Sequence, residues 1–81
     1  MAAMAAEVLA VTPSGIVTAR TPGPEFPIEG SRLGAPSLGF SAIVLRVFGP
    51  VGRPYLALRP RVRLPAALAA RLVGAALRAE G

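Results

Sequence analysis

Side chains able to do acid, base or nucleophilic chemistry are few in this chain of 81 residues. It contains no His and no Cys, which removes the commonest general base and the thiolate ligands of metal ions. Its carboxylates are Glu7, Glu25, Glu29 and Glu80. They lie in different segments, and only Glu25 and Glu29 could come close. Its serines, Ser14, Ser31, Ser37 and Ser41, have no His or Lys to activate them. We therefore expect no enzymatic activity, no cofactor and no metal site.

Two glycine spacings resemble phosphate-binding loops, from Gly30 to Gly34 and from Gly49 to Gly52. Neither precedes a convincing helix, and neither supplies the Lys that such a loop needs. We therefore interpret both as turns.

The net charge of +5 comes entirely from nine Arg residues against four Glu residues. Guanidinium groups favour planar, bidentate or stacked contacts with phosphate, carboxylate or aromatic groups, so an acidic partner is expected. The arginines are spaced singly, and only Arg59, Arg61 and Arg63 cluster, so this partner need not be nucleic acid. A GC-rich genome would also produce an all-arginine set.

The stretch from Arg46 to Pro60 holds the best candidate for a binding surface. Phe48, Tyr55 and Ala57 are predicted to face outward beside a Pro-rich loop. The bracketing cations are Arg46, Arg53 and Arg59. Aromatic, Pro and Arg groups gathered in this way are typical of a protein interface. Two alternatives stay open: the aromatic rings could stack on unpaired bases, or Phe48 could close a barrel end while the arginines are solvated.

The elements that position these groups are short strands separated by Gly and Pro. Alternation and branched residues predict strands over 7–12, 16–20, 28–33, 40–48 and 55–59. Thr12-Pro13-Ser14-Gly15 predicts a tight hairpin turn, and a second turn is predicted at Gly34-Ala35-Pro36. Residues 21–27 and 49–54 are predicted loops. Leu56 and Leu58 should face inward. The strand 40–48 has two apolar faces, which predicts that other parts of the protein pack against both of them.

The C-terminal segment from Pro65 onward allows two interpretations. Its many Ala residues and the Pro at its start favour a helix, but Gly74 interrupts the pattern. One unbroken helix competes with a short helix over 65–70 followed by a strand over 72–78. Five or six short strands in so small a chain predict an all-β fold, a small antiparallel barrel with a short C-terminal helical turn. We expect a frayed start over 1–6 and a single domain over 7–81.

The chain shows no signature of membrane targeting. Its apolar opening lacks a basic region and is interrupted by Glu7, and no apolar run approaches the roughly 20 residues needed to span a bilayer. An intracellular soluble protein, monomeric when isolated and without a membrane partner, is therefore expected.

The segment VFGPVGRPYLALRP, residues 47–60, resembles the signature of the glycine/arginine-rich subunit of box H/ACA ribonucleoproteins, the first GAR protein, in its short archaeal form. The opening EVLAVTPSGIVTART resembles the first hairpin of that family, and Leu72-Val73-Gly74 with Leu77 resembles its last strand. The resemblance covers roughly residues 7–78. The family usually has Gly where Ala42 stands and an acidic residue where Arg46 stands. The stretch from Pro65 to Gly74 is longer here, and the glycine/arginine-rich tails are absent.

This resemblance implies a six-stranded barrel similar to domain II of elongation factors. It implies a subunit without activity of its own that docks on a dyskerin-type pseudouridine synthase and aids substrate RNA placement and turnover in rRNA processing and ribosome biogenesis. Contact with the H/ACA guide RNA would be weak or indirect. The expected compartment is the cytoplasm of an archaeal-type cell, or the nucleolus in a eukaryote. The alternative is a stand-alone basic barrel that binds RNA directly.

The candidate docking residues combine this motif with the bracketing arginines. They are Phe48, Gly49, Pro50, Val51, Arg53, Pro54, Tyr55 and Arg59.

Overall fold

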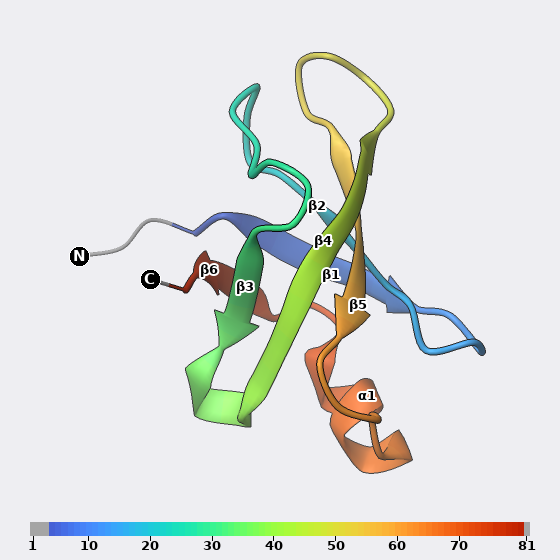
Figure 1. Ribbon diagram of the computed structural model, residues 1–81. Coiled ribbons are helices and arrows are strands. Elements are labelled where there is room, and N and C mark those ends of the chain that lie inside the picture. Colours follow the sequence, from blue (N-terminus) through green and yellow to red (C-terminus); the bar gives the residue numbers. More distant parts are fainter. Residues whose placement is uncertain (1–3, 81) are drawn as a thin grey trace.

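A computed structural model describes residues 4–80 and contains six strands and one α-helix (Figure 1). The elements are β1 (Ala6–Val11), β2 (Val17–Arg20), β3 (Arg32–Ala35), the 3-10 helix η1 (Pro36–Leu38), β4 (Phe40–Phe48), β5 (Tyr55–Pro60), α1 (Ala66–Leu72) and β6 (Ala76–Ala79). The strands form a closed barrel in the order β1-β2-β5-β4-β3-β6, and every pair is antiparallel. The predicted all-β class and small barrel are confirmed.

The turn between β1 and β2 is built by the residues that predicted it. Gly15 has a φ of +91°, a conformation that L side chains rarely adopt. Its N–H donates to the Thr12 carbonyl at 2.9 Å. The Ile16 N–H donates to Thr12 Oγ1 at 3.0 Å. These bonds close the hairpin and fix the register of its two strands.

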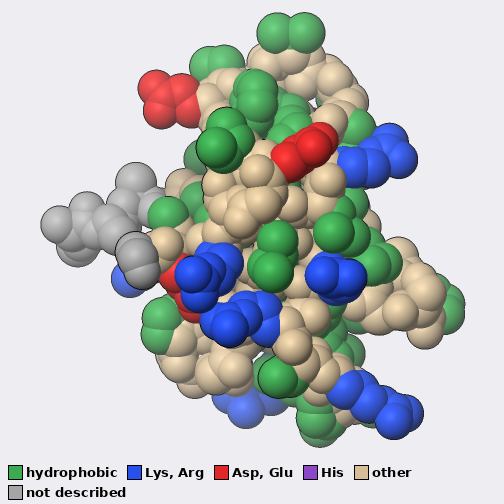
Figure 2. Space-filling model, in the orientation of Figure 1, with side chains coloured by type: hydrophobic (Ala, Val, Ile, Leu, Met, Phe, Trp, Pro, Cys, Tyr) green, Lys and Arg blue, Asp and Glu red, His purple; other side chains and the backbone are tan. Residues whose placement is uncertain are grey.

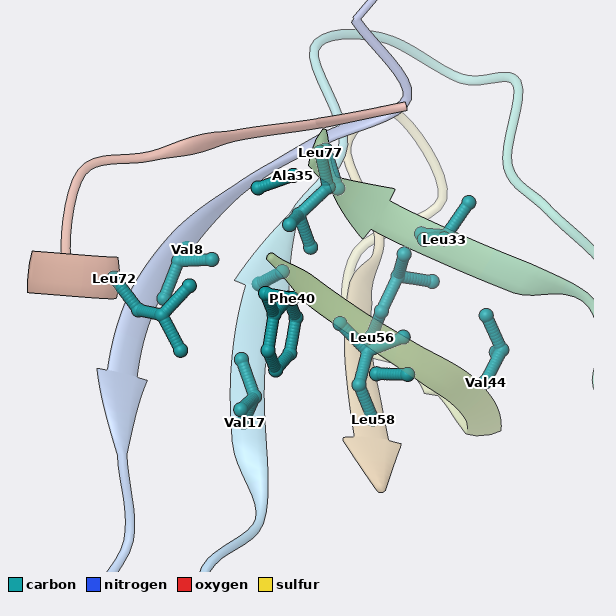
Figure 3. Close-up of a cluster of buried hydrophobic side chains, with 13 residues drawn as sticks. Val8, Val17, Leu33, Ala35, Phe40, Val44, Leu56, Leu58, Leu72 and Leu77 are labelled. Atoms are coloured by element: carbon teal, nitrogen blue, oxygen red, sulfur yellow. The ribbon is translucent and has the colours of Figure 1, made fainter. Parts of the chain in front are cut away.

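The core fills the barrel with small and branched side chains (Figure 3). Leu56 and Leu58 are fully buried, as their alternation predicted. Leu72 of α1 is also fully buried, so the helix contributes to the core. The buried hydrophobic set is Ala6, Val8, Val17, Ala19, Leu33, Ala35, Phe40, Ala42, Val44, Leu56, Leu58, Leu72 and Leu77.

Two strands change their inward face part-way along. The β1–β2 register shifts between Val8 and Ala10, and the β4–β5 register shifts between Val44 and Arg46. A β-bulge of this kind inserts one unpaired residue and bends the strand, as a closed barrel requires. The prediction that both faces of 40–48 are covered is therefore wrong for the second half of the strand, where Leu45 and Phe48 are each 37% exposed.

The third strand lies later than predicted. Residues 28–31 belong to the loop, and β3 runs from Arg32 to Ala35, so the predicted turn at Gly34-Ala35-Pro36 is instead strand followed by η1. Gly34 suits a strand here because a Cβ at this position would lie 2.8 Å from the Phe40 carbonyl oxygen. The turn glycine is Gly39, with a φ of +65° and an N–H that donates to the Pro36 carbonyl.

The C-terminal segment adopts the helix-then-strand interpretation, with shifted boundaries. Pro65 precedes the first helical residue, and the helix continues to Leu72. The break comes at Gly74, whose φ is +86°, so the expected strand over 72–78 is shorter and starts at Ala76. Among residues 4–80, no helix has the length and apolar character needed to cross a bilayer.

The barrel begins earlier than the predicted frayed start over 1–6 would allow. Ala6 is the first residue of β1 and is fully buried. The Ala5 N–H donates to the Leu77 carbonyl at 2.8 Å. Residues 1–3 of that predicted segment lie outside the described part of the chain.

Candidate functional site

The candidate docking residues gather at the end of the barrel where β4 passes into β5. The loop 49–54 that joins these strands projects from that end, beside the long β2–β3 loop (Figure 1). Phe48 and Tyr55 are directly opposite each other in the β4–β5 register. Their rings are stacked, with centroids 5.7 Å apart and planes inclined by 30°. The loop therefore rises from a paired aromatic base.

Two arginines extend this pair into a row of four side chains across three strands. The Arg20 guanidinium carbon lies 5.2 Å from the Tyr55 ring centroid, and the Arg46 guanidinium carbon lies 5.5 Å from the Phe48 ring centroid. Both distances fit cation–π contact. We call Arg20, Tyr55, Phe48 and Arg46 the aromatic row. Each aromatic ring thus has an arginine partner as well as its aromatic neighbour.

Gly49 is the residue that allows Tyr55 to lie against the loop. Its φ is +92°, and a Cβ built on it would lie 2.6 Å from Tyr55 Cδ2. Both the backbone conformation and the close approach of the ring require a residue without a side chain. Gly49 therefore positions the aromatic row.

Thr21 fastens the other side of the loop to the barrel. It is fully buried, its N–H donates to the Pro54 carbonyl at 3.1 Å, and its hydroxyl lies 2.8 Å from the Gly23 carbonyl and 3.1 Å from the Pro54 carbonyl. Arg53 Nε donates back to the Thr21 carbonyl at 3.3 Å. These bonds connect the loop 49–54 to the first residues of the β2–β3 loop.

Large hydrophobic side chains are exposed around the aromatic row. Val51 at the loop tip is 91% exposed, and on the β2–β3 loop Ile28 is 73% and Phe26 is 51% exposed. Beside them lies an open, largely apolar groove of about 600 Å³, formed by residues 22–27 with Met4, Ala5 and Ala79. Hydrophobic side chains gather over these loops at the top of Figure 2 together with acidic ones, since the β2–β3 loop also carries the exposed Glu25 and Glu29, whereas most of the arginine seen on that face lies lower. We call the exposed hydrophobic side chains of these two loops and their base, Phe26, Ile28, Phe48 and Val51, the apolar end.

No family model matches this chain, and comparison with curated proteins finds no match. What the site can bind must therefore be inferred from its own side chains. Within residues 4–80 no group of His, Cys, Asp or Glu side chains could hold a metal ion. The apolar end offers exposed hydrophobic area, two aromatic rings and arginine donors, which are the groups that recognise another macromolecule's surface.

The eight candidate residues do not all belong to this surface. Phe48, Gly49, Pro50, Val51 and Tyr55 come together at the loop. Pro54 is buried, so it shapes the loop and offers no contact area. Arg53 is exposed at the loop but one of its nitrogens bonds to the barrel. Arg59 is misplaced by the sequence reasoning, because it pairs with Ile43 near the far end of β5.

Sequence reasoning missed two groups of residues. Arg20 and Thr21 join the site only because β2 pairs with β5, with Arg20 opposite Tyr55; no local pattern reveals a pairing between strands 35 residues apart. Phe26 did carry a signal, whereas Ile28 was predicted to begin the strand 28–33. Large apolar side chains in a Pro-rich and Gly-rich loop have no strand to bury them, which marks them as candidates for a surface contact.

Proposed function

We propose that this chain is a non-catalytic accessory subunit of an H/ACA RNA-guided pseudouridylation complex. Its apolar end would dock on the catalytic domain of a dyskerin-type pseudouridine synthase and aid substrate RNA placement and turnover in rRNA processing. The observation that carries this proposal is the presentation of Phe48, Val51 and Tyr55 on and beside a loop whose sequence resembles the family signature. Its compartment would be the cytoplasm of an archaeal-type cell, or the nucleolus in a eukaryote.

The attachment of this loop to the barrel suits it to docking. Val51 is almost fully exposed and contributes little to the core, and the end of its loop is bonded to Thr21 through Arg53 and Pro54. A surface already held in its binding shape loses less conformational entropy when a partner binds. Aromatic residues and Arg in such a position often supply most of the binding energy of an interface.

Arg46 suggests what the partner presents opposite this surface. The related family usually carries an acidic residue here, whereas Arg46 lies over the Phe48 ring. Arg20 Nε, on the other side of the row, is buried without a hydrogen-bond partner among the described residues. An acidic side chain of the synthase facing this row would pair with the exposed Arg46 guanidinium.

The geometry disfavours the alternative that Phe48 and Tyr55 stack on unpaired RNA bases. A base-stacking platform needs a free ring face. Here the two rings stack on each other, and each also has an arginine over it. Because only the ring faces are occupied, a partner could still contact the ring edges and the neighbouring Val51.

Binding to the purified synthase of the same organism, without RNA, tests the proposal. Val51→Asp should weaken binding by about thirtyfold or more, because it places a charge in the centre of an apolar contact. Val73→Asp is the matched control: Val73 is 55% exposed, lies next to α1, and receives the same change. It should alter the dissociation constant by less than about threefold, as expected for a residue outside the contact.

Two results would contradict the proposal. One is a wild-type chain that does not bind the synthase, and the other is a Val51→Asp variant that binds as tightly as the Val73→Asp variant. Tyr55 is a less suitable probe, because its ring also packs against Gly49 and its removal would alter the loop itself.

A further inference from the structure

The opposite end of the barrel contains an open groove that the proposed docking does not use. It has a volume of about 590 Å³. One wall is the β1–β2 turn, residues 13–16, and the other is the end of β5 with the connection to α1, residues 59–64. Arg59, Arg61 and Arg63 lie in this second wall. We call this feature the arginine groove.

Its charge is unbalanced. Three of the nine arginines fall within five residues, all three side chains are exposed, and no Glu lines the groove. Cations brought this close repel one another, and an anionic ligand would relieve that repulsion. Each guanidinium also presents a planar set of N–H donors that matches the oxygens of a phosphate group.

The two walls are fixed by backbone bonds. The Arg61 N–H donates to the Ser41 carbonyl at 3.0 Å, which holds the chain against β4 after β5 ends. Across the groove, the turn is closed by the Gly15 and Thr12 bonds. Ser14, at its tip, has its hydroxyl 3.0 Å from Thr12 Oγ1. The groove therefore has a set shape and adds a hydroxyl to the guanidinium donors.

The arrangement of the cations indicates the kind of anion. A single phosphate or carboxylate needs donors that converge on one point, whereas these arginines alternate with Pro60 and Val62 along the connection. Cations in a row match an anion that repeats. No aromatic side chain lines the groove, so it lacks the stacking surface with which single-strand readers contact bases.

We propose that the arginine groove binds the phosphate backbone of RNA, without reading its bases. This site lies at the other end of β5 from the loop 49–54, so it does not depend on the docking surface proposed above. Because phosphate contacts dominate, binding should be weak, with a dissociation constant of about 1–100 µM at physiological salt.

The test compares two double variants with the same net charge. Arg61→Gln with Arg63→Gln removes two groove cations, and Arg32→Gln with Arg78→Gln removes two exposed cations from β3 and β6. Each lowers the formal charge from +5 by two. Fluorescence anisotropy with a labelled RNA of about 12 nucleotides, a length within the range that one small binding domain covers, gives the affinity between about 50 and 200 mM salt.

For wild type, log K should fall against log salt with a slope of about −2, since each phosphate contact on a single strand contributes about −0.7. The groove variant should reduce this slope to about −0.7, whereas the control variant should keep it. Equal losses in both variants would show that only net charge matters and would overturn the proposal.

Two further arms distinguish RNA from other polyanions. Poly-glutamate of matched charge should compete poorly with RNA, and phosphatidylserine vesicles should not bind through the groove. Poly-glutamate that competes as well as unlabelled RNA would overturn the assignment to RNA. The assignment to RNA would also be overturned if the wild-type protein bound the vesicles but not RNA, and if only the groove variant lost the vesicle binding.

Discussion

Replacing Gly49 by Ala tests how the loop 49–54 is held. At a φ of +92°, a residue with a Cβ is strained by about 1–2 kcal/mol. The new Cβ would also lie 2.6 Å from Tyr55 Cδ2, whereas carbon atoms in contact are about 3.5–4.0 Å apart. The Tyr55 ring must therefore move by about 1 Å, which weakens contacts worth about 0.5–1.5 kcal/mol with Phe48 and about 0.5–1 kcal/mol with Arg20.

Together these effects should lower the free energy of unfolding by about 2–4 kcal/mol. That is a large share of the roughly 4–12 kcal/mol expected for a domain of this size. Urea denaturation followed by far-UV circular dichroism measures the loss. Gly52→Ala is the control, because Gly52 is in the same loop, lacks a positive φ and would place its Cβ in open space.

The control should change stability by less than about 1 kcal/mol, in either direction. The reasoning is refuted if Gly49→Ala is no less stable than Gly52→Ala, since neither the backbone conformation nor the ring contact would then constrain the loop.

Three further predictions concern the core, the loop attachment and catalysis. Leu58→Ala should lower the free energy of unfolding by about 2–5 kcal/mol, because it leaves a cavity in a fully buried site. Leu45→Thr, at a partly exposed position, should lower it by less than about 1 kcal/mol. Equal losses in urea denaturation would contradict the assigned faces of these strands. Thr21→Val should cost about 1–3 kcal/mol, because it buries a methyl group in place of the hydroxyl that lies 2.8 Å from the Gly23 carbonyl and 3.1 Å from the Pro54 carbonyl, while the Thr21 N–H still donates to Pro54, and an unchanged urea midpoint would count against this attachment. The isolated chain incubated with guide and substrate RNA should form no pseudouridine, and turnover detected by nucleoside analysis without a synthase would rule out an accessory role.

The sequence predicted an element of this fold correctly where a residue type or a short pattern is compatible with only one local conformation. Pro13 and Gly15 identify a hairpin turn, and the alternation of Leu56 and Leu58 identifies the inward face of β5. The same reasoning was wrong about β4, because a bulge near Leu45 changes which side chains face inward. The bulge bends β4 so that the sheet can close into a barrel. This bend depends on the other strands, so the sequence of the nine residues of β4 alone does not predict it.

The candidate site was predictable to the extent that it lies in one segment. Phe48, Val51 and Tyr55 are close in sequence and lie in one loop or directly beside it, so their association needed no knowledge of the order of the strands. The sequence did not predict that Arg20 belongs to the aromatic row, and it wrongly placed Arg59 at the site, for the same reason. Their places depend on how β5 pairs with its neighbours and on how far along the strand each residue lies.

The apolar end and the arginine groove lie at opposite ends of β5, a strand of six residues that spans about 17 Å at the usual rise. Ligands at the two ends would not compete for space, and the barrel between them keeps their separation constant. A protein held at one end that also carries an RNA strand would place that strand near the groove at a high effective concentration, in the millimolar range for a short connection. Under that condition a groove with only micromolar affinity would stay occupied, and release of the protein would release the RNA with it.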